Sequence, residues 1–182
     1  MKEEKSAVAA EQAAQQEMGE LLRIRRDKLA ALQQEDKNPF AITKYPVDNY
    51  AAHIKEEFAG IANEEETGKV VRLGGRLMSK RLMGKASFAD LRDSTGDIQL
   101  YVRRDNVGEE EYAAFKKFDI GDVVGVEGEV FRTKMGEISI KVEKIQLLSK
   151  SLRPLPEKWH GLKDTDLRYR QRYVDLIVNP EV

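Results

Sequence analysis

The sequence Val71-Arg-Leu-Gly-Gly-Arg-Leu77 alternates between apolar residues and residues that suit an exposed position. A period of two is typical of a β-strand with one buried face. Two consecutive glycines inside such a strand fit a sharp bend, because glycine has no side chain to obstruct it. We therefore expect this segment to be a bent strand that serves both edges of a small barrel.

The same alternation recurs four times further along the chain, with a short helix predicted over 109–118 between the third and fourth strands. The order of strand, strand, strand, helix, strand, strand in about 80 residues is that of an OB-fold, a five-stranded Greek-key β-barrel that binds oligonucleotides. We predict a mainly β fold with flanking helices and place the barrel at 69–150. Its expected inward residues after the first strand are Ala89, Leu91, Ile98, Leu100, Val102, Val124, Val126, Val130, Ile138, Ile140 and Val142.

Helical segments flank the expected barrel on both sides. Residues 6–36 lack proline and carry a stripe of Met18, Leu22, Leu29 and Leu32, in which Arg25 takes the place of one apolar residue. Residues 1–68 therefore form a helical extension and connector, with a second short helix for which Asp48 is a candidate N-cap. Residues 151–182 read as a strap followed by a helix over 165–178, whose apolar side has little to cover in this chain and therefore suggests a missing partner or domain.

Composition excludes several classes of function. The 182 residues include no cysteine and two histidines, so disulfide scaffolds, thiolate metal sites and cysteine nucleophiles are ruled out. We expect no metal site and no catalytic residue in this chain. No apolar run approaches the roughly 18 residues of a membrane span, and the N-terminus lacks the apolar core of a signal peptide. The expected location is therefore cytoplasmic, without a membrane partner.

The net charge of −1 conceals an uneven distribution of charge. Residues 1–68 carry a net −5 and residues 69–182 a net +4. Between Arg72 and Lys85 there is no acidic residue, and a focused basic stripe of this kind suggests contact with a polyanion. A solvated strand face explains the same pattern equally well. The members of the stripe are Arg72, Arg76, Lys80, Arg81 and Lys85.

Parity along the strands predicts which side chains face solvent. If Ala89, Leu100 and Ile140 face the core, then Phe88, Gln99 and Glu137 face outward. An exposed ring stacks on a base and an exposed amide reads its edge, so this pair is typical of a base-reading surface. Burial of Phe88 under a loop or a helix is the structural alternative. Counting in twos from Leu77 places Arg81 inward, which requires a β-bulge or the end of the strand.

Carboxylate pairs give no sign of catalysis. Asp90 with Asp93, and Asp164 with Asp166, stand at turn or cap signals with no histidine nearby, so we interpret them as capping residues. His53 lies beside an apolar stripe and is expected on the surface.

Several longer motifs make the sequence similar to the N-terminal anticodon-binding part of class II lysyl-tRNA synthetases of the bacterial type. The resemblance begins near residue 20 and runs to the end of the chain. The motifs are Arg23-Ile-Arg-Arg-Asp-Lys-Leu29, Gly75-Arg-Leu-Met-Ser-Lys-Arg-Leu-Met-Gly-Lys-Ala-Ser-Phe88, Asp97-Ile-Gln-Leu-Tyr-Val102, Lys134-Met-Gly-Glu-Ile-Ser139, Leu152-Arg-Pro-Leu-Pro-Glu-Lys-Trp-His-Gly161 and Leu167-Arg-Tyr-Arg-Gln-Arg-Tyr-Val-Asp-Leu176.

The resemblance implies a set of residue roles. It implies that Phe88 stacks on the central uridine of a U-rich lysine anticodon, that Arg81 and Gln99 bond that uracil's edge, and that Glu137 contacts a neighbouring base. Arg72, Arg76, Lys80 and Lys85 are candidate contacts to the tRNA backbone. For the full-length protein the resemblance implies a homodimeric ligase that attaches lysine to tRNA(Lys) with ATP and Mg²⁺, whereas this part should bind tRNA without catalysing the reaction.

Two other functions fit the same sequence. An OB-fold without sequence choice would bind single strands of any base composition, and would bind U-rich and C-rich loops equally. A free-standing interaction piece would dimerise through helices 18–35 and 165–178 without any dependence on nucleic acid.

Overall fold

A computed structural model describes residues 2–156 and 165–179, with side chains from residue 16 onward. The chain divides into two compact units, one formed by Met1–Ile24 with Leu152–Val182 and the other by Arg25–Ser151. His160, Asp164 and much of the expected strap lie outside the described residues. The boundaries predicted at 68 and 150 stay predictions.

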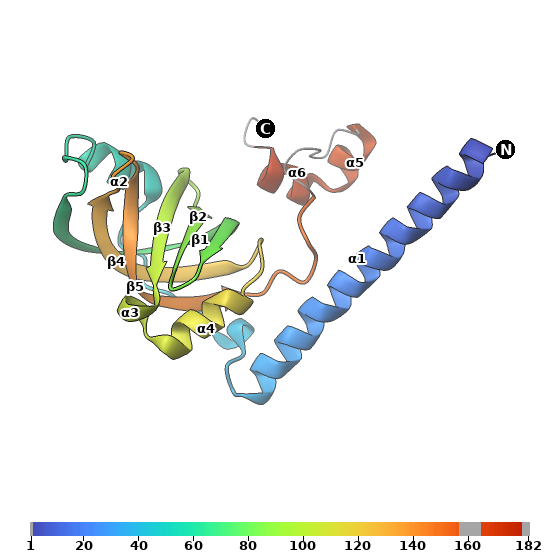
Figure 1. Cartoon of the computed structure of the whole chain (residues 1–182), viewed down its shortest axis with the longest axis horizontal. Coiled ribbons are helices and arrows are strands. Elements are labelled where there is room, and N and C mark those ends of the chain that lie inside the picture. The colour runs from blue at the N-terminus through green and yellow to red at the C-terminus, as the bar shows by residue number, and fades with distance from the viewer. Residues whose placement is uncertain (1, 157–164, 180–182) are drawn as a thin grey trace. The chain divides into compact units, whose positions relative to one another are not determined.

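Five strands in the unit 25–151 close into a barrel in the order β1-β2-β3-β5-β4 (Figure 1). All neighbouring pairs are antiparallel except β3 and β5. The predicted five-stranded OB-fold order is therefore confirmed. The strands are β1 Glu66–Met83, β2 Ala86–Arg92, β3 Asp97–Arg103, β4 Val123–Arg132 and β5 Ile138–Ser149.

The first strand bends as its glycines predict. Residues 70–76 pair with β4, residues 76–83 pair with β2, and Arg76 has partners on both sides. A Cβ atom on Gly75 would lie 2.5 Å from the carbonyl oxygen of Arg92, so a side chain cannot occupy this position without a shift of the backbone. The absence of a side chain thus allows one strand to close both edges of the barrel.

The barrel core consists of the residues that parity placed inside. Leu73, Leu77, Leu91, Leu100 and Ile140 are all fully buried. Removing side chains of this size from water stabilises the fold by about 1.5–3 kcal/mol each. The alternation along each strand therefore accounts for most of the fold.

Helices cover the two ends of the barrel (Figure 1). α4 Glu109–Lys117 follows the short α3 Arg104–Val107 and inserts the rings of Tyr112 and Phe115 into the core at one end. The hydroxyl of Tyr112 lies 2.7 Å from Oγ of the buried Ser87. At the other end lies α2 Ala51–Glu57, which buries Ala51 and Ile54. The outer wall of β1, β2 and β3 stays uncovered by either helix.

The N-cap expected at Asp48 is wrong. The N-terminus of α2 is capped instead from the β2–β3 turn, where Asp93 accepts a hydrogen bond from the amide of Ala51 at 2.7 Å. Asp48 accepts hydrogen bonds from the amide of Arg72 at 2.8 Å and from its guanidinium at 3.1 Å. Asp93 is thus a capping residue, as its turn signal predicted, and His53 is exposed.

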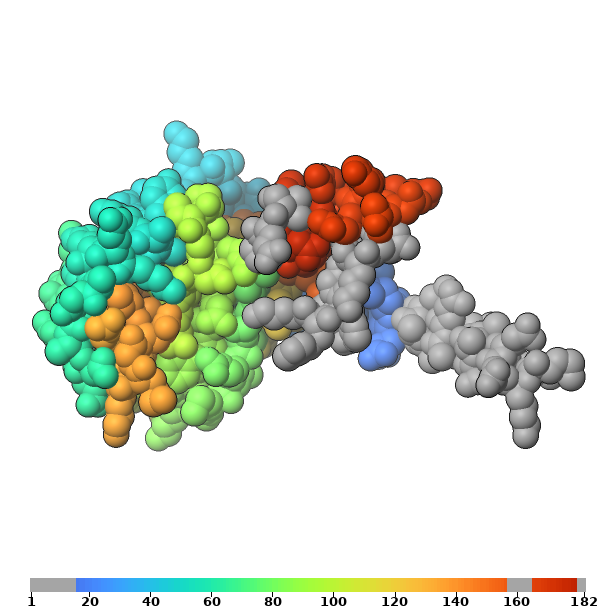
Figure 2. All heavy atoms as spheres, turned by 90° about the horizontal axis from the view of Figure 1, so that it is seen from above, coloured from blue at the N-terminus to red at the C-terminus, as the bar shows by residue number. Residues whose placement is uncertain are grey.

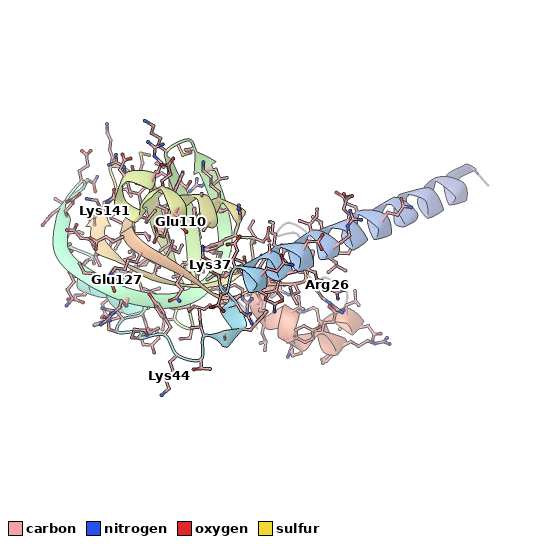
Figure 3. All side chains as sticks on the ribbon, turned by 90° about the horizontal axis from the view of Figure 1, so that it is seen from below. Arg26, Lys37, Lys44, Glu110, Glu127 and Lys141 are labelled. Atoms are coloured by element: carbon pink, nitrogen blue, oxygen red, sulfur yellow. The ribbon has the colours of Figure 1, made fainter. Side chains whose placement is uncertain are left out.

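α1 Lys2–Gln34 forms close to the predicted range, and its last turns pack on the barrel. Arg25 is only 8% exposed and donates to the carbonyls of Ser151 at 2.9 Å and Ile120 at 3.1 Å. These two hydrogen bonds explain why Arg25 stands within the apolar stripe of α1. Just beyond the helix, Lys37 lies 3.2 Å from Glu110 of α4 (Figure 3).

A buried ion-pair cluster lies where the end of α1 meets the end of β5. Lys150 and Asp122 are almost completely buried and their charged groups are 2.8 Å apart. Lys28 and Lys150 both reach Asp119, at 2.6 and 2.5 Å. Because each buried charge has an opposite partner, the cluster fixes these segments without leaving an uncompensated ion.

The helix expected over 165–178 is broken. α5 Thr165–Arg170 and α6 Arg172–Val178 are separated at Gln171, whose φ of −116° and ψ of 49° are not helical. The fully buried Asp175 accepts hydrogen bonds from Arg168, Arg172 and Asn179. Burial raises the pKa of the Asp175 carboxyl, but these hydrogen bonds outweigh it and lower the pKa overall. Within the described ranges, no helix is long and apolar enough to cross a membrane.

Candidate nucleic-acid interface

A β-bulge brings Arg81 to the outer face of the barrel. The pairing of β1 with β2 shifts between Leu77 and Ser79, so that Arg81 stands opposite Phe88. The parity conflict at Arg81 is therefore resolved by the bulge, one of the two explanations expected. Arg81 is exposed and has no ion pair or hydrogen bond among the residues that the structure describes. Its guanidinium is available to a ligand on this face.

An aromatic row crosses this face beside Arg81. Phe88 of β2 and Tyr101 of β3 are register partners, and their rings stack with centroids 4.9 Å apart. Phe131 of β4 continues the row at 5.8 Å from Tyr101. All three side chains are partly exposed, so Phe88 is not covered by a helix or loop. Rings held against a sheet in this way form a platform on which bases can stack.

A second row, parallel to the first, is polar. Asp90 stands opposite Gln99, and Gln99 stands opposite Ser139 of β5. Each of these two side chains contacts a serine hydroxyl. Ser79 donates a hydrogen bond to Asp90, and Oγ of Ser139 lies 3.1 Å from the amide oxygen of Gln99. Gln99 is partly exposed, as its outward parity predicts. Ser139 has no exposed surface, although it lies on the outward side.

Glu137 lies at the end of the polar row, in the turn between β4 and β5. It is exposed, and its carboxylate is 3.2 Å from the ammonium of Lys55. Figure 2 shows the β4–β5 turn region in orange beside the green surface of β2 and β3. The structure thus brings Arg81, Phe88, Gln99 and Glu137 to one continuous face, whatever that face binds.

Two of the four candidate backbone contacts, Arg76 and Lys80, are used within the fold. The ammonium of Lys80 lies against the carbonyls of Phe115, Lys116 and Phe118, at the C-terminal end of α4. Burial lowers the pKa of Lys80. Arg76 donates to the carbonyl of Gly121 at 2.7 Å, and Arg72 pairs with Asp48. Lys85 is exposed in the β1–β2 turn and has no side-chain partner within the described part of the chain.

Sequence reasoning missed three members of the site. Tyr101 and Phe131 are aromatic residues at outward positions, and the same parity that selected Phe88 could have selected them. Ser139 lies on the outward side by the same alternation as Glu137, but its contact with Gln99 depends on the parallel register of β3 and β5, which has no local signal. Among the described residues there is no cluster of three or more side chains able to hold a metal ion.

The fold and this face define a nucleic-acid-binding OB-fold domain. In agreement, residues 71–148 match the tRNA anticodon family, described as an OB-fold nucleic acid binding domain. The matched range begins in β1 and ends in β5.

The chain is homologous to part of lysine–tRNA ligase, as its motifs predicted. It is 57% identical over 92% of its length to the lysine–tRNA ligase of Thermoanaerobacter sp. (strain X514), and 56% identical over 96% to that of Clostridium perfringens (strain ATCC 13124). The protein of that name from Pelotomaculum thermopropionicum is 50% identical over the whole chain. The chain spans about a third of the length of these relatives, 32%, 33% and 35% respectively.

Proposed function

We propose that the barrel face bearing Arg81, Phe88, Gln99 and Glu137 binds the anticodon loop of tRNA(Lys) and selects its uridines. One observation carries this proposal: three neighbouring strands each place one such group on the same face. These groups are the guanidinium of Arg81, which has no partner among the described residues, the ring of Phe88 and the amide of Gln99. Bases in a loop are unstacked, so a surface of this kind can stack on one base and bond its edge.

Each residue has a distinct role in the proposal. Phe88, backed by Tyr101, stacks on the central base. Arg81 and Gln99 supply hydrogen-bond donors to the oxygen atoms of a uracil edge, and Glu137 accepts a hydrogen bond from the neighbouring base. Phosphate contacts fall to Lys85 and to Arg72, whose ion pair with Asp48 is exposed, whereas Arg76 and Lys80 bond backbone carbonyls of the barrel.

For the full-length protein we propose the activity that the names of its relatives state, the ligation of lysine to tRNA. ATP and Mg²⁺ would serve that reaction outside the barrel face described above. The resemblance further supports a cytoplasmic, homodimeric enzyme. The barrel's part in this reaction is to choose the tRNA, not to perform chemistry.

A titration with RNA hairpins tests the proposal. The chain is mixed with an anticodon stem-loop carrying UUU and with the same loop carrying cytidine at the centre, at low and moderate salt. We expect the uridine loop to bind about tenfold more tightly or better, in line with the roughly 1–3 kcal/mol that base-edge contacts contribute to discrimination. Both affinities should fall with salt, because phosphate contacts release counterions. Equal binding of the two loops would refute anticodon selection and leave a general single-strand binder.

A further inference from the structure

Ser139 is a hydroxyl-bearing residue with no exposed surface, placed beside the one amide of the proposed base-reading face. Its Oγ lies 3.1 Å from Oε1 of Gln99 and 3.3 Å from the carbonyl oxygen of Glu137. A serine hydroxyl has a single hydrogen to donate, so only one of these acceptors can take it at a time.

The arrangement of the other donors favours Gln99 as the acceptor. The carbonyl of Glu137 already accepts a hydrogen bond from the amide of Thr133 at 2.9 Å. The Gln99 oxygen has no second donor among the described residues and is the nearer of the two acceptors. A hydroxyl that donates to an amide sets the orientation of that amide, because only the amide oxygen can accept. Here the hydroxyl of the buried Ser139 holds Oε1 of Gln99 toward β5.

The orientation of the amide decides what it can recognise. With Oε1 held by Ser139, the NH₂ group of Gln99 points toward the exposed face, where no described residue accepts from it. Uracil offers an oxygen at the position where cytosine offers an amino group. An outward NH₂ group donates a hydrogen bond to the uracil oxygen. Opposite the cytosine amino group it faces another donor, so both groups are left unpaired.

We infer that Ser139 is a positioning residue for base selection, which fixes the Gln99 amide so that the face accepts uridine and rejects cytidine. This inference rests on the proposed function. It goes beyond it because Ser139 is buried and touches no base itself. Without the hydroxyl, the amide can turn over and present its oxygen to a cytosine amino group.

The test compares Ser139→Ala with the unchanged chain in the hairpin titration. We expect the preference for uridine over cytidine to fall about three- to tenfold, the effect of one hydrogen bond, mainly through tighter binding of the cytidine loop. Ser79→Ala is the matched control, because it removes the hydroxyl at the other end of the same row, which bonds Asp90 and not Gln99. Its uridine preference should stay within about twofold of the original value.

A double variant separates positioning from a general structural effect. In a Gln99→Ala background, Ser139→Ala should have no further effect on the uridine-to-cytidine ratio, since the group it positions is absent. Thermal unfolding confirms that each variant is folded. An unchanged ratio in Ser139→Ala would overturn this inference alone, provided that the parent prefers uridine. A parent chain without any preference would overturn the proposed function, and this inference with it.

Discussion

Lys80 and Arg81 are neighbours in the chain, but their side chains lie on opposite sides of the barrel wall. Lys80 stands opposite the inward Ala89 and reaches the carbonyls at the end of α4, whereas Arg81 stands opposite the outward Phe88. The bulge after Leu77 sets this division. One of the two cations therefore supports the fold, and the other is available to a ligand.

Replacing each of these cations by methionine should separate stability from binding. Lys80→Met leaves the carbonyls of Phe115, Lys116 and Phe118 without their donor and should lower the free energy of unfolding by about 1–3 kcal/mol. Arg81→Met, at an exposed site, should change it by less than about 0.5 kcal/mol. Urea unfolding measures both values. The affinity for the uridine hairpin should fall in Arg81→Met and stay constant in Lys80→Met, and the reverse pattern would contradict the assignment.

Phe88→Ala should weaken hairpin binding by about 1–3 kcal/mol, the contribution of one base stacked on a ring. Phe88→Leu is the control, since it keeps an apolar side chain over Tyr101 but offers no ring to a base. If stacking is the cause, both variants lose affinity for the uridine and cytidine loops alike. A loss confined to Phe88→Ala would instead indicate that packing against Tyr101 matters more than stacking.

The Asp119 carboxylate should make the stability of the barrel depend on acid pH. Burial raises its pKa, but hydrogen bonds from Lys150 and Lys28 outweigh burial and hold the pKa below its usual value. A lowered pKa in the folded state means that the carboxylate stabilises the fold above the unfolded pKa of about 3.9, and that this contribution disappears as the pH falls through the folded value.

Asp119→Asn tests this dependence. At pH 7 the variant should be less stable than the parent, because Lys150 is buried and loses one of its two carboxylate partners. The difference in urea midpoint should begin to shrink as the pH falls below about 4, the unfolded pKa, and should disappear only below the lower folded pKa, where the parent's carboxyl is protonated as well. Asp48→Asn, at an exposed ion pair with Arg72, is the control and should show little difference at either pH.

Gly128→Ala should destabilise the barrel. The Cβ atom would lie 2.2 Å from the carbonyl oxygen of Lys141, at a point where the pairing of β4 with β5 is irregular. Because the obstacle is backbone, it cannot rotate away, and we expect a loss of about 1–3 kcal/mol by urea unfolding. Gly60→Ala meets no atom within 4 Å and serves as the control. Equal stability of the two variants would show that the strands can separate at little cost.

Strand alternation was sufficient to predict the barrel, because burial of one face imposes a period of two on the sequence. Phe88 and Gln99 were placed outward by the same parity, and the conflict at Arg81 correctly required a bulge or a strand end. The bend at Gly75 was also readable, since a strand that turns a corner needs a residue without a side chain. These features are local, and the sequence records them directly.

Contacts between distant segments could not be predicted in this way. Asp93 replaces Asp48 as the cap of α2 because the β2–β3 turn lies at the helix N-terminus only in the folded barrel. Lys80 and Lys150 lie among basic or polar residues in the sequence, and only the tertiary fold directs them to buried acceptors. The break at Gln171 interrupts an otherwise continuous helical pattern. The hydrophobic period of one segment contains no information on any of these contacts.

Gln99→Glu should reverse the choice of base. A carboxylate can only accept hydrogen bonds, and Ser139 can still donate to one of its oxygens, so the other oxygen would face the ligand. That oxygen repels the uracil oxygen and bonds the cytosine amino group. The added negative charge weakens binding of any RNA, so the ratio of the two hairpin affinities is the decisive quantity.

We expect the ratio to move from a uridine preference to parity or a cytidine preference, a change of about tenfold or more. Gln99→Met keeps the size of the side chain without its polar atoms and should reduce the preference without reversing it. If Glu and Met give the same ratio, the amide at position 99 does not read the base edge.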